Sequence, residues 1–262
     1  MGPFLIFPVL FHRAGGAYHA AEKGKPMSEE IFRQDAYAKS CEATVTQVDE
    51  RGIQLDRTVF YPAGGGQPGD SGVLRRADGT EVAIDDTFKS TDTGNPVHVP
   101  GEGGAGLAVG DTVTAEIDWD RRFAHMRMHT ALHLLCAVVD GGVTGGSIGA
   151  EKSRLDFDLP DTQLDKEQIT RDLNRLVDED HPVGDRWITD DELEADSDLV
   201  RTMSVKPPTG AGRVRLLDIP GVDLQPCGGT HVGRTGEIGR LRVGKIENKG
   251  RHNRRINIHL DE

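Results

Sequence analysis

Cysteines and long hydrophobic runs are both scarce in this sequence of 262 residues. The three cysteines are widely spaced and odd in number, which excludes a disulfide framework and favours a reducing, cytoplasmic setting. The most hydrophobic run, residues 4–11, is broken by Pro8 and is much shorter than the ~20 apolar residues that a membrane-spanning helix needs. We therefore expect no membrane partner.

Aromatic and lysine residues are also few, whereas acidic residues are abundant. Aromatics make up 5% of the chain, arginines outnumber lysines 22 to 9, and aspartates outnumber glutamates 27 to 16. This profile indicates an aspartate-coated surface suited to high salt, and the net charge of −12 by itself argues against a nucleic-acid partner. The charge is uneven, however, because residues 1–205 carry −17 and residues 206–259 carry +7. The basic segment keeps a polyanionic partner open.

Three stretches of different pattern divide the chain. Residues 1–26 precede a second methionine, Met27, and we expect them to be a poorly ordered or artefactual N-terminal extension. Residues 27–118 alternate apolar and polar residues in short runs between glycine-rich turns, which predicts a small β-barrel. Residues 119–262 mix helical and strand patterns, so the predicted fold class is α+β. The elements predicted in this last part are a helix over 119–139, a strand over 154–158, a helix over 164–178, an acidic loop over 190–198, and strands over 214–217, 238–243 and 256–260.

Two short motifs could together bind a metal ion. His129 and His133 are four residues apart in the first predicted helix, so both imidazoles project from one face. Cys227 and His231 flank two glycines and a threonine, a spacing that lets the backbone fold around an ion. A cysteine with three histidines is a known ligand set for Zn²⁺, because soft sulfur and imidazole favour that ion over Mg²⁺ or Ca²⁺.

Other ligand sets remain open at this level. His125 lies four residues before His129, so these two could form the helical pair instead. Cys136 could also reach the ion, although its apolar neighbours favour a thiol in the core. Four protein ligands indicate a closed structural site, whereas a catalytic Zn²⁺ usually keeps one position for water.

A glycine-rich loop and a basic stripe are the remaining functional candidates. The glycines at 64–66 allow close approach to the backbone, and Gln67 adds an amide that could orient a substrate or water, although a flexible hairpin is the simpler reading. The basic stripe suits a phosphate backbone or, alternatively, a charged edge strand. Its residues are Lys245, Lys249, Arg251, Arg254 and Arg255.

Together these motifs resemble the editing domain of alanyl-tRNA synthetases and their freestanding AlaX-type relatives. The matching stretches are residues 56–72, 118–135, 146–157 and 227–255. The acid that this family usually carries in the stretch Tyr-Pro-x-Gly-Gly-Gly-Gln is replaced here by Ala63. The resemblance implies a freestanding protein of medium length, in which the β-barrel (27–118) precedes a zinc-containing editing domain (119–262).

The resemblance also implies roles for individual residues. One Zn²⁺ would be bound by His129, His133, Cys227 and His231. Gln67 and the Gly64, Gly65 and Gly66 loop would approach the acceptor end of tRNA, and Thr58 matches the threonine associated with telling serine from alanine. The implied activity is ATP-independent deacylation of tRNA(Ala) mischarged with serine and, to a lesser extent, glycine.

Three other functions are compatible with the same motifs. Threonyl-tRNA synthetase editing domains share the His-x-x-x-His and Cys-x-x-x-His pattern, so Ser-tRNA(Thr) is an alternative substrate. A non-catalytic, zinc-stapled RNA-binding module would need the metal only for folding. A zinc hydrolase acting on a small ester would not need the basic stripe. No motif specifies an oligomeric state.

Overall fold

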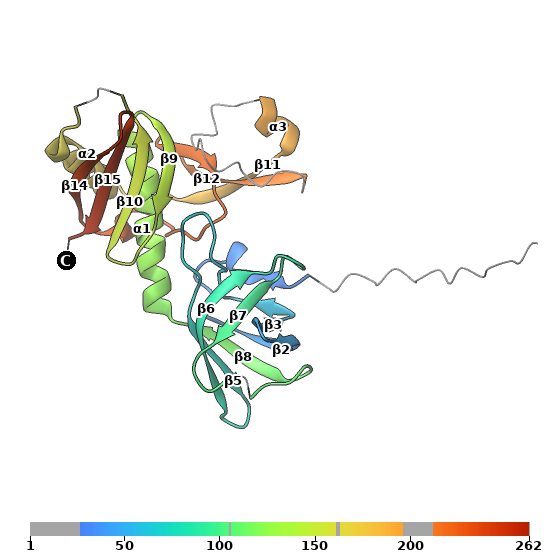
Figure 1. The fold of residues 1–262 in the computed structure, drawn as a ribbon. Coiled ribbons are helices and arrows are strands. Elements are labelled where there is room, and N and C mark those ends of the chain that lie inside the picture. The colour runs from blue at the N-terminus through green and yellow to red at the C-terminus, as the bar shows by residue number, and fades with distance from the viewer. Residues whose placement is uncertain (1–26, 105, 161–162, 196–211, 262) are drawn as a thin grey trace, which may run out of the picture.

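The computed structural model describes residues 27–104, 106–160, 163–195 and 212–261. The expectation for residues 1–26 lies outside these ranges. The described residues form mostly strands with a few helices, which confirms the α+β class (Figure 1). No helix among them is long and apolar enough to cross a membrane.

A closed six-stranded barrel forms the first part of the fold, as the alternating patterns predicted. Its strands follow the order β2-β3-β7-β6-β5-β8, and β8 pairs with β2 to close it. Alternate side chains of β8, namely Val113, Ala115 and Ile117, point inward and help to fill the interior. The bounds are β2 Ser40–Asp49, β3 Gly52–Leu55, β5 Gly72–Arg76, β6 Glu81–Lys89, β7 Pro96–Pro100 and β8 Thr112–Ile117. Outside the barrel, β1 (Glu29–Glu30) leads into the short helix η1 (Ile31–Arg33) and pairs with β4 (Arg57–Thr58).

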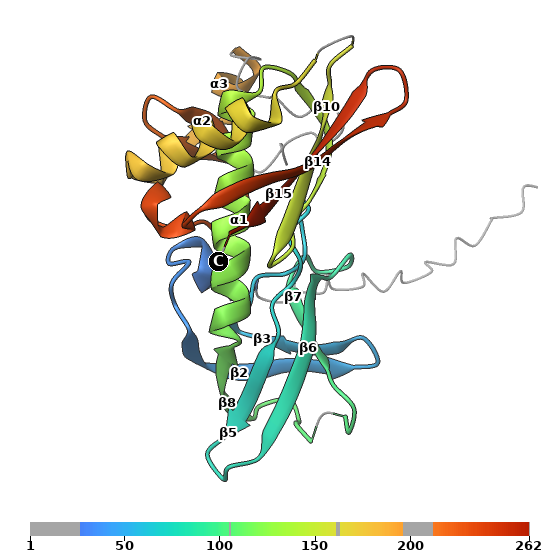
Figure 2. The same cartoon turned by 90° about the vertical axis from the view of Figure 1, so that its left-hand side faces the viewer.

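The long helix α1 (Trp119–Val138) leaves the barrel and runs through the second part of the molecule (Figure 2). Asp118 begins it by accepting a hydrogen bond from the Arg121 backbone N–H. Twelve of its side chains are buried, so the helix forms the centre of the second core. Trp119 packs against both cores, at the junction where the domain boundary was predicted.

Two sheets and a second helix pack around α1, and a third helix packs against one of these sheets. The four-stranded sheet has the order β14-β15-β10-β9, and α2 (Lys166–Asp178) packs against β14. The three-stranded sheet has the order β11-β12-β13. The bounds are β9 Gly142–Ser147, β10 Lys152–Asp158, β11 Gly184–Thr189, β12 Arg213–Ile219, β13 Asp223–Pro226, α3 Asp190–Ala195, η3 Thr235–Ile238, β14 Leu241–Lys249 and β15 Asn253–Leu260.

Two local predictions are wrong. The stretch expected to be an acidic loop begins with a helix, α3, because Thr189 and Glu192 cap it reciprocally: the Glu192 N–H donates to the Thr189 hydroxyl, and the Glu192 carboxylate accepts from the Thr189 N–H. The strand predicted from 238 starts at Leu241, because Ile238 belongs to η3. Strands β9, β11 and β13 were not predicted, whereas α1, β10, α2, β12, β14 and β15 follow the predicted order.

Candidate metal centre

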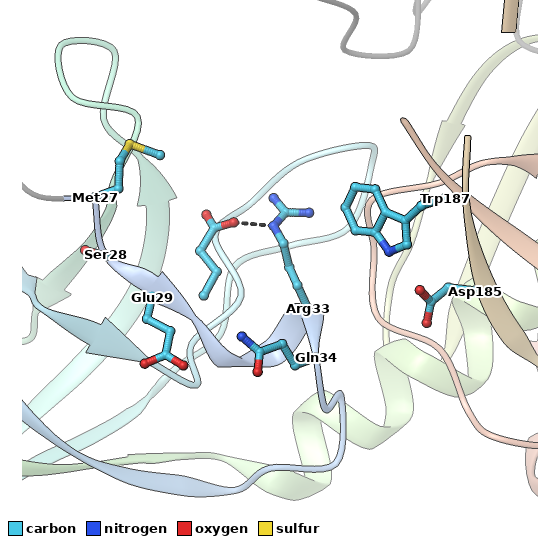
Figure 3. Close-up of a pocket in the computed structure, with 8 residues that line it drawn as sticks. Met27, Ser28, Glu29, Arg33, Gln34, Asp185 and Trp187 are labelled. Carbon is cyan, nitrogen blue, oxygen red and sulfur yellow. Dashed lines mark hydrogen bonds and ion pairs between the residues drawn. The ribbon is translucent and has the colours of Figure 1, made fainter. Parts of the chain in front are cut away.

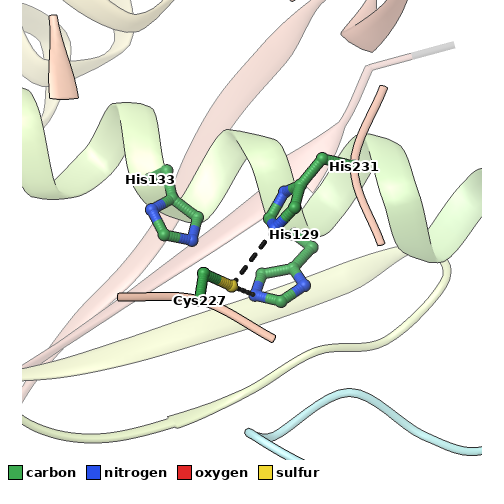
Figure 4. Close-up of side chains that lie close together, drawn as sticks. All are labelled: His129, His133, Cys227 and His231. Atoms are coloured by element: carbon green, nitrogen blue, oxygen red, sulfur yellow. Dashed lines mark hydrogen bonds between the residues drawn. The ribbon is translucent and has the colours of Figure 1, made fainter. Parts of the chain in front are cut away.

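The four predicted ligands converge on one point between α1 and the loop after β13 (Figure 4). One ligand atom from each of His129, His133, Cys227 and His231 lies within 4.8 Å of the others. The Cys227 Sγ is 3.5 Å from His129 Nε2 and 3.2 Å from His231 Nε2. A tetrahedral ion with bonds of ~2.0–2.3 Å separates its ligands by about 3.3–3.8 Å. The two Sγ–Nε2 distances lie close to this range, so the cluster is compatible with a bound metal ion.

Each of the three imidazoles is oriented by a partner on its outer nitrogen. His129 Nδ1 lies 2.9 Å from Gln67 Oε1, and His133 Nδ1 lies 2.8 Å from the buried Asp223 carboxylate. His231 Nδ1 lies 3.2 Å from the Thr130 hydroxyl, which itself donates to a backbone carbonyl.

All three outer partners act as acceptors. Each Nδ1 can therefore donate to its outer partner, which leaves Nε2 as the ring atom available to a metal ion, the arrangement found around protein-bound metals. The residues present thus fit a metal ion.

The electrostatics of the cluster also suit a cation. Burial raises the pKa of the Cys227 thiol, but the neighbouring His129 and His231 outweigh burial and bring it well below the usual thiol range. Burial lowers the pKa of His231 to about 3, so its imidazole is neutral. For His133, burial lowers the pKa, but contacts with Asp223 and Cys227 raise it to about 10. The thiolate and the neutral His231 imidazole suit a divalent ion, and binding of the ion would release the proton that Asp223 and Cys227 favour on His133.

The loop from Cys227 to His231 is held tightly against α1. A side chain at Gly229 would bring its Cβ within 2.2 Å of the His129 ring and 2.8 Å of Gln67 Oε1, so only glycine fits. Arg215 on β12 donates to the carbonyls of Cys227 and Gly229, at 3.1 and 3.0 Å. These contacts fix the position of the thiolate.

The glycine-rich loop is anchored to the same helix. The Arg122 guanidinium forms a fully buried, two-pronged ion pair with Asp70, and the neighbouring Arg121 donates to the Gly69 carbonyl. Gln67 is buried, and its amide donates to the Thr230 hydroxyl at 2.8 Å while its oxygen faces His129. The glycine-rich loop, α1 and the loop from Cys227 to His231 therefore meet at Gln67.

The alternative ligands lie apart from the centre. Among the described residues, the only metal-compatible His/Cys/Asp/Glu group contains neither His125 nor Cys136. Cys136 is buried in the core, as its apolar neighbours indicated, and none of the three cysteines forms a disulfide. The structure thus brings His129 and His133, rather than His125 and His129, together with Cys227 and His231.

Two family profiles match this chain. One, described as tRNA synthetases class II (A), matches residues 22–121, and the other, described as the threonyl and alanyl tRNA synthetase second additional domain, matches residues 214–257. The alanyl-tRNA editing protein AlaX-M of Methanosarcina acetivorans is 38% identical over 88% of this chain and 98% of its own length. The chain belongs to the alanyl-tRNA editing protein family.

Other relatives agree with this assignment. The AlaX-M protein of Pyrococcus horikoshii is 34% identical over 90% of this chain and 99% of its own length. The alanine–tRNA ligase of Pyrobaculum calidifontis is 37% identical over 85% of this chain, which matches only 25% of that longer enzyme. The resemblance noted in the sequence is thus confirmed.

The glycine loop and Thr58, which were also predicted to act in the reaction, are not part of the ligand cluster. Gly64, Gly65 and Gly66 are exposed, and Gly64 and Gln67 exchange backbone hydrogen bonds across the turn. Thr58 is fully buried in the barrel, where its hydroxyl lies 2.8 Å from His98 Nε2 and accepts from the Phe60 N–H. The contacts of Thr58 are thus with barrel residues.

The basic stripe lies on the hairpin formed by β14 and β15. Arg255 makes two hydrogen bonds to Asp156, at 2.7 and 2.8 Å, and Lys249 pairs with Glu247 at 2.8 Å. Lys245 lies farther from the same glutamate, at 3.7 Å, with 77% of its side chain exposed. Arg251 is exposed in the turn, and Arg254 is half-buried with a hydrogen bond to the Asn253 carbonyl. Acidic neighbours thus offset part of the stripe's charge.

Sequence reasoning missed the residues that orient the imidazoles. Asp223 and Thr130 are 90 and 101 residues away from their histidine partners, so only the folded chain brings them together. The Asp70–Arg122 pair is separated by 52 residues and was missed for the same reason.

Proposed function

We propose that this chain is a trans-editing hydrolase that deacylates mischarged tRNA(Ala), chiefly Ser-tRNA(Ala) and secondarily Gly-tRNA(Ala), at a zinc site. Its membership of the alanyl-tRNA editing family makes it an aminoacyl-tRNA deacylase, a carboxylic ester hydrolase. The observation that carries the proposal is the cluster of His129, His133, Cys227 and His231 with an outer partner on each imidazole. We place this activity in the cytoplasm, as the cysteine content predicts.

The metal would be held by these four side chains. When bound, Zn²⁺ supplies a Lewis-acidic centre that favours attack on an ester carbonyl. Gln67 acts on the reaction by positioning His129, because its amide oxygen holds the Nδ1 side of that ring. The exposed backbone of Gly64–Gly66 borders Gln67, where an incoming acceptor end can approach it without side-chain obstruction.

The reaction is the hydrolysis of one ester bond. Water adds to the carbonyl carbon of the amino acid, and the bond to the ribose oxygen breaks, which releases free serine and uncharged tRNA. Backbone N–H groups of the glycine loop can donate to the developing oxyanion. Neither ATP nor a covalent enzyme intermediate is required.

The preference for serine over alanine follows from hydrogen bonding. A site that offers a partner to the serine hydroxyl strongly disfavours alanine, which lacks that group. We propose that Thr58 contributes to this selection by fixing the backbone that leads into the glycine loop, because its hydroxyl bonds both His98 and the Phe60 N–H. A Thr58→Val variant tests this role through the ratio of kcat/KM for the two tRNAs.

The test of the proposal uses four charged tRNAs. Zinc-loaded protein is incubated with Ser-tRNA(Ala), Gly-tRNA(Ala), Ala-tRNA(Ala) and Ser-tRNA(Thr), and the remaining ester is measured over time. We expect fastest loss of Ser-tRNA(Ala), slower loss of Gly-tRNA(Ala), and persistence of Ala-tRNA(Ala). Preferential hydrolysis of Ser-tRNA(Thr), or no hydrolysis at all, would contradict the proposal.

A further inference from the structure

A cavity of about 520 Å³ opens between the segment from Met27 to Gln34 and strand β11 (Figure 3). Arg33 and Gln34 lie on one side of it, and Trp187 and Asp185 on the other. Its volume falls within the range of about 300–1,000 Å³ typical of small-ligand sites. Nothing in the proposed chemistry at the metal centre uses these residues.

Trp187 is unusual in this chain because it is a large aromatic side chain left in solvent. Its exposed fraction is 43%, whereas the other tryptophan, Trp119, is packed on Phe123 with ring centroids 5.5 Å apart. The Arg213 guanidinium lies over the indole at 5.9 Å from the ring centroid. An exposed indole beside arginine is the combination on which unpaired nucleic-acid bases stack.

The cavity borders the loop that carries the metal ligands. Trp187 on β11 is directly opposite Arg215 on β12, and Arg215 holds the carbonyls of Cys227 and Gly229. On the other wall, a Cβ at Gly228 would lie only 3.8 Å from the Arg33 Nη1. The segment from 227 to 229 is therefore held by Arg215, the strand neighbour of Trp187, and lies close to Arg33 of the other wall.

The acids of the lining are offset by neighbouring arginines, and one further arginine lies beside the indole. Each acid in the lining has a cationic partner: Glu29 pairs with Arg57, Glu30 with Arg33, and Asp185 lies 3.7 Å from Arg215. Arg213, next to the indole, adds a positive charge beyond these pairs. A base can stack on Trp187, its phosphate can approach Arg213, and the Gln34 amide offers a donor and an acceptor to the base edge.

We propose that Trp187 is the stacking platform for an unpaired nucleotide of the RNA acceptor end, next to the nucleotide whose ester reaches the metal centre. This inference rests on the proposed function, since it assumes that an RNA 3′ end enters beside the loop from 227 to 229. Trp187 is a binding residue in this account and takes no part in bond cleavage.

The experiment uses the zinc-loaded protein, the RNA trinucleotide CCA as binding probe, and Ser-tRNA(Ala) as substrate. We expect CCA to quench the tryptophan emission of the wild type saturably, and we expect no quenching in Trp187→Phe, whose only tryptophan is Trp119. Trp187→Phe retains a stacking ring and should keep a KM near the wild-type value. Trp187→Ala should raise KM roughly 5- to 150-fold with little change in kcat, because stacking on an aromatic side chain is lost.

The control is Val109→Ala, which removes an apolar side chain that is 66% exposed before β8. Its KM and its quenching by CCA should equal those of the wild type. Quenching that persists in Trp187→Phe, or an unchanged KM in a folded Trp187→Ala protein, would overturn the inference. A wild type that is quenched by CCA but leaves Ser-tRNA(Ala) intact would refute the proposed function while supporting the stacking site.

Discussion

At the scale of single residues, the two glycines between the metal ligands differ in their surroundings. A Cβ at Gly229 would overlap the His129 ring and Gln67, whereas the nearest atom to a Cβ at Gly228 lies 3.8 Å away. Gly229→Ala must therefore displace a ligand or the residue that orients it, while Gly228→Ala meets only ordinary contact. Comparing the two variants therefore separates an effect on the metal site from a general effect of stiffening the loop.

We predict that Gly229→Ala lowers zinc affinity at least tenfold and reduces deacylation, and that Gly228→Ala retains both. Zinc content after dialysis, measured by mass spectrometry, and the initial rate on Ser-tRNA(Ala) check this prediction. Equal zinc content in the two variants would show that the close approach of Gly229 to His129 has no role in metal binding.

The Asp223 carboxylate is the second residue-scale test, because it holds the outer nitrogen of His133 at 2.8 Å. Outer partners of metal-binding histidines typically contribute 10- to 100-fold to metal affinity. We expect a loss of that size in Asp223→Asn, measured by competition with a chromophoric chelator. Asp178→Asn, at an exposed ion pair with Arg240, is the matched control and should bind zinc as the wild type does.

At the scale of elements, α1 connects the barrel to the metal centre. Its first turns hold the glycine loop through Arg121 and Arg122, and two turns later it presents His129 and His133. Asp70 and Arg122 are 1% and 0% exposed, so loss of one partner leaves a buried, uncompensated charge.

We predict that Asp70→Ala lowers the free energy of unfolding by about 3–5 kcal/mol, as expected for breaking a buried pair. The same change at the exposed pair, Asp178→Ala, should cost about 0–1 kcal/mol. Urea unfolding followed by circular dichroism measures both values. Similar losses in the two variants would mean that burial of the Asp70–Arg122 pair has no special effect on stability.

His98 gives the barrel a dependence on pH. Its imidazole is fully buried, which lowers its pKa from 6.5 to about 4, although a hydrogen bond to the Ile53 carbonyl acts in the opposite direction. Between these two values the unfolded chain binds more protons than the folded chain, so stability falls as the pH drops from about 6.5 to about 4. The loss amounts to about 3 kcal/mol for this group.

We expect His98→Gln to show a shallower fall in stability over this range than the wild type, measured by urea unfolding at a series of pH values. The buried His125, whose pKa burial also lowers to about 4, contributes equally to both proteins. His252→Gln, in an exposed turn, should retain the wild-type slope. Identical slopes for the wild type and His98→Gln would exclude His98 as the source of the fall in stability at low pH.

Local patterns in the sequence were sufficient to predict the helix that carries two of the four candidate metal ligands. The apolar residues of 119–139 recur at helical spacing, and a four-residue separation aligns His129 with His133 on any α-helix. β11 could not be found in this way, because its side chains are almost all exposed and show no alternation. The capping pair Thr189 and Glu192 was a readable signal for α3 that the acidic composition obscured.

The contacts that complete the site are beyond sequence reasoning for a different reason. Gln67 meets Thr230 across 163 residues, and nothing in either local pattern specifies that partner. Such contacts depend on how the glycine-rich loop, α1 and the loop from Cys227 to His231 pack together.

At the scale of the whole molecule, the charge distribution indicates which face meets RNA. The net charge of −12 divides into an acidic body and a basic segment of +7 over 206–259. Lys245, Lys249 and Arg251 are exposed on the β14–β15 hairpin, whereas Arg255 is engaged by Asp156. We expect the exposed members to contact phosphates.

Neutralising Lys245, Lys249 and Arg251 to glutamine should weaken tRNA binding and reduce the salt dependence of its affinity. The slope of log K against log salt should fall by about 0.7–0.9 for each phosphate that the protein no longer neutralises. Fluorescence anisotropy with labelled tRNA at several salt concentrations measures the slope. A triple neutralisation on the barrel, at Arg51, Arg75 and Arg76, should leave the slope nearly unchanged. An equal fall of the slope in both variants would contradict the prediction that tRNA contacts only one face.

Deacylation of Ser-tRNA(Ala) by the zinc-loaded protein, with and without a chelator, tests the central claim most directly. The account predicts rapid loss of the serine ester with zinc, strong inhibition after chelation, recovery when zinc is restored, and no comparable loss of Ala-tRNA(Ala). An ester that stays intact in the presence of folded, zinc-loaded protein would contradict it.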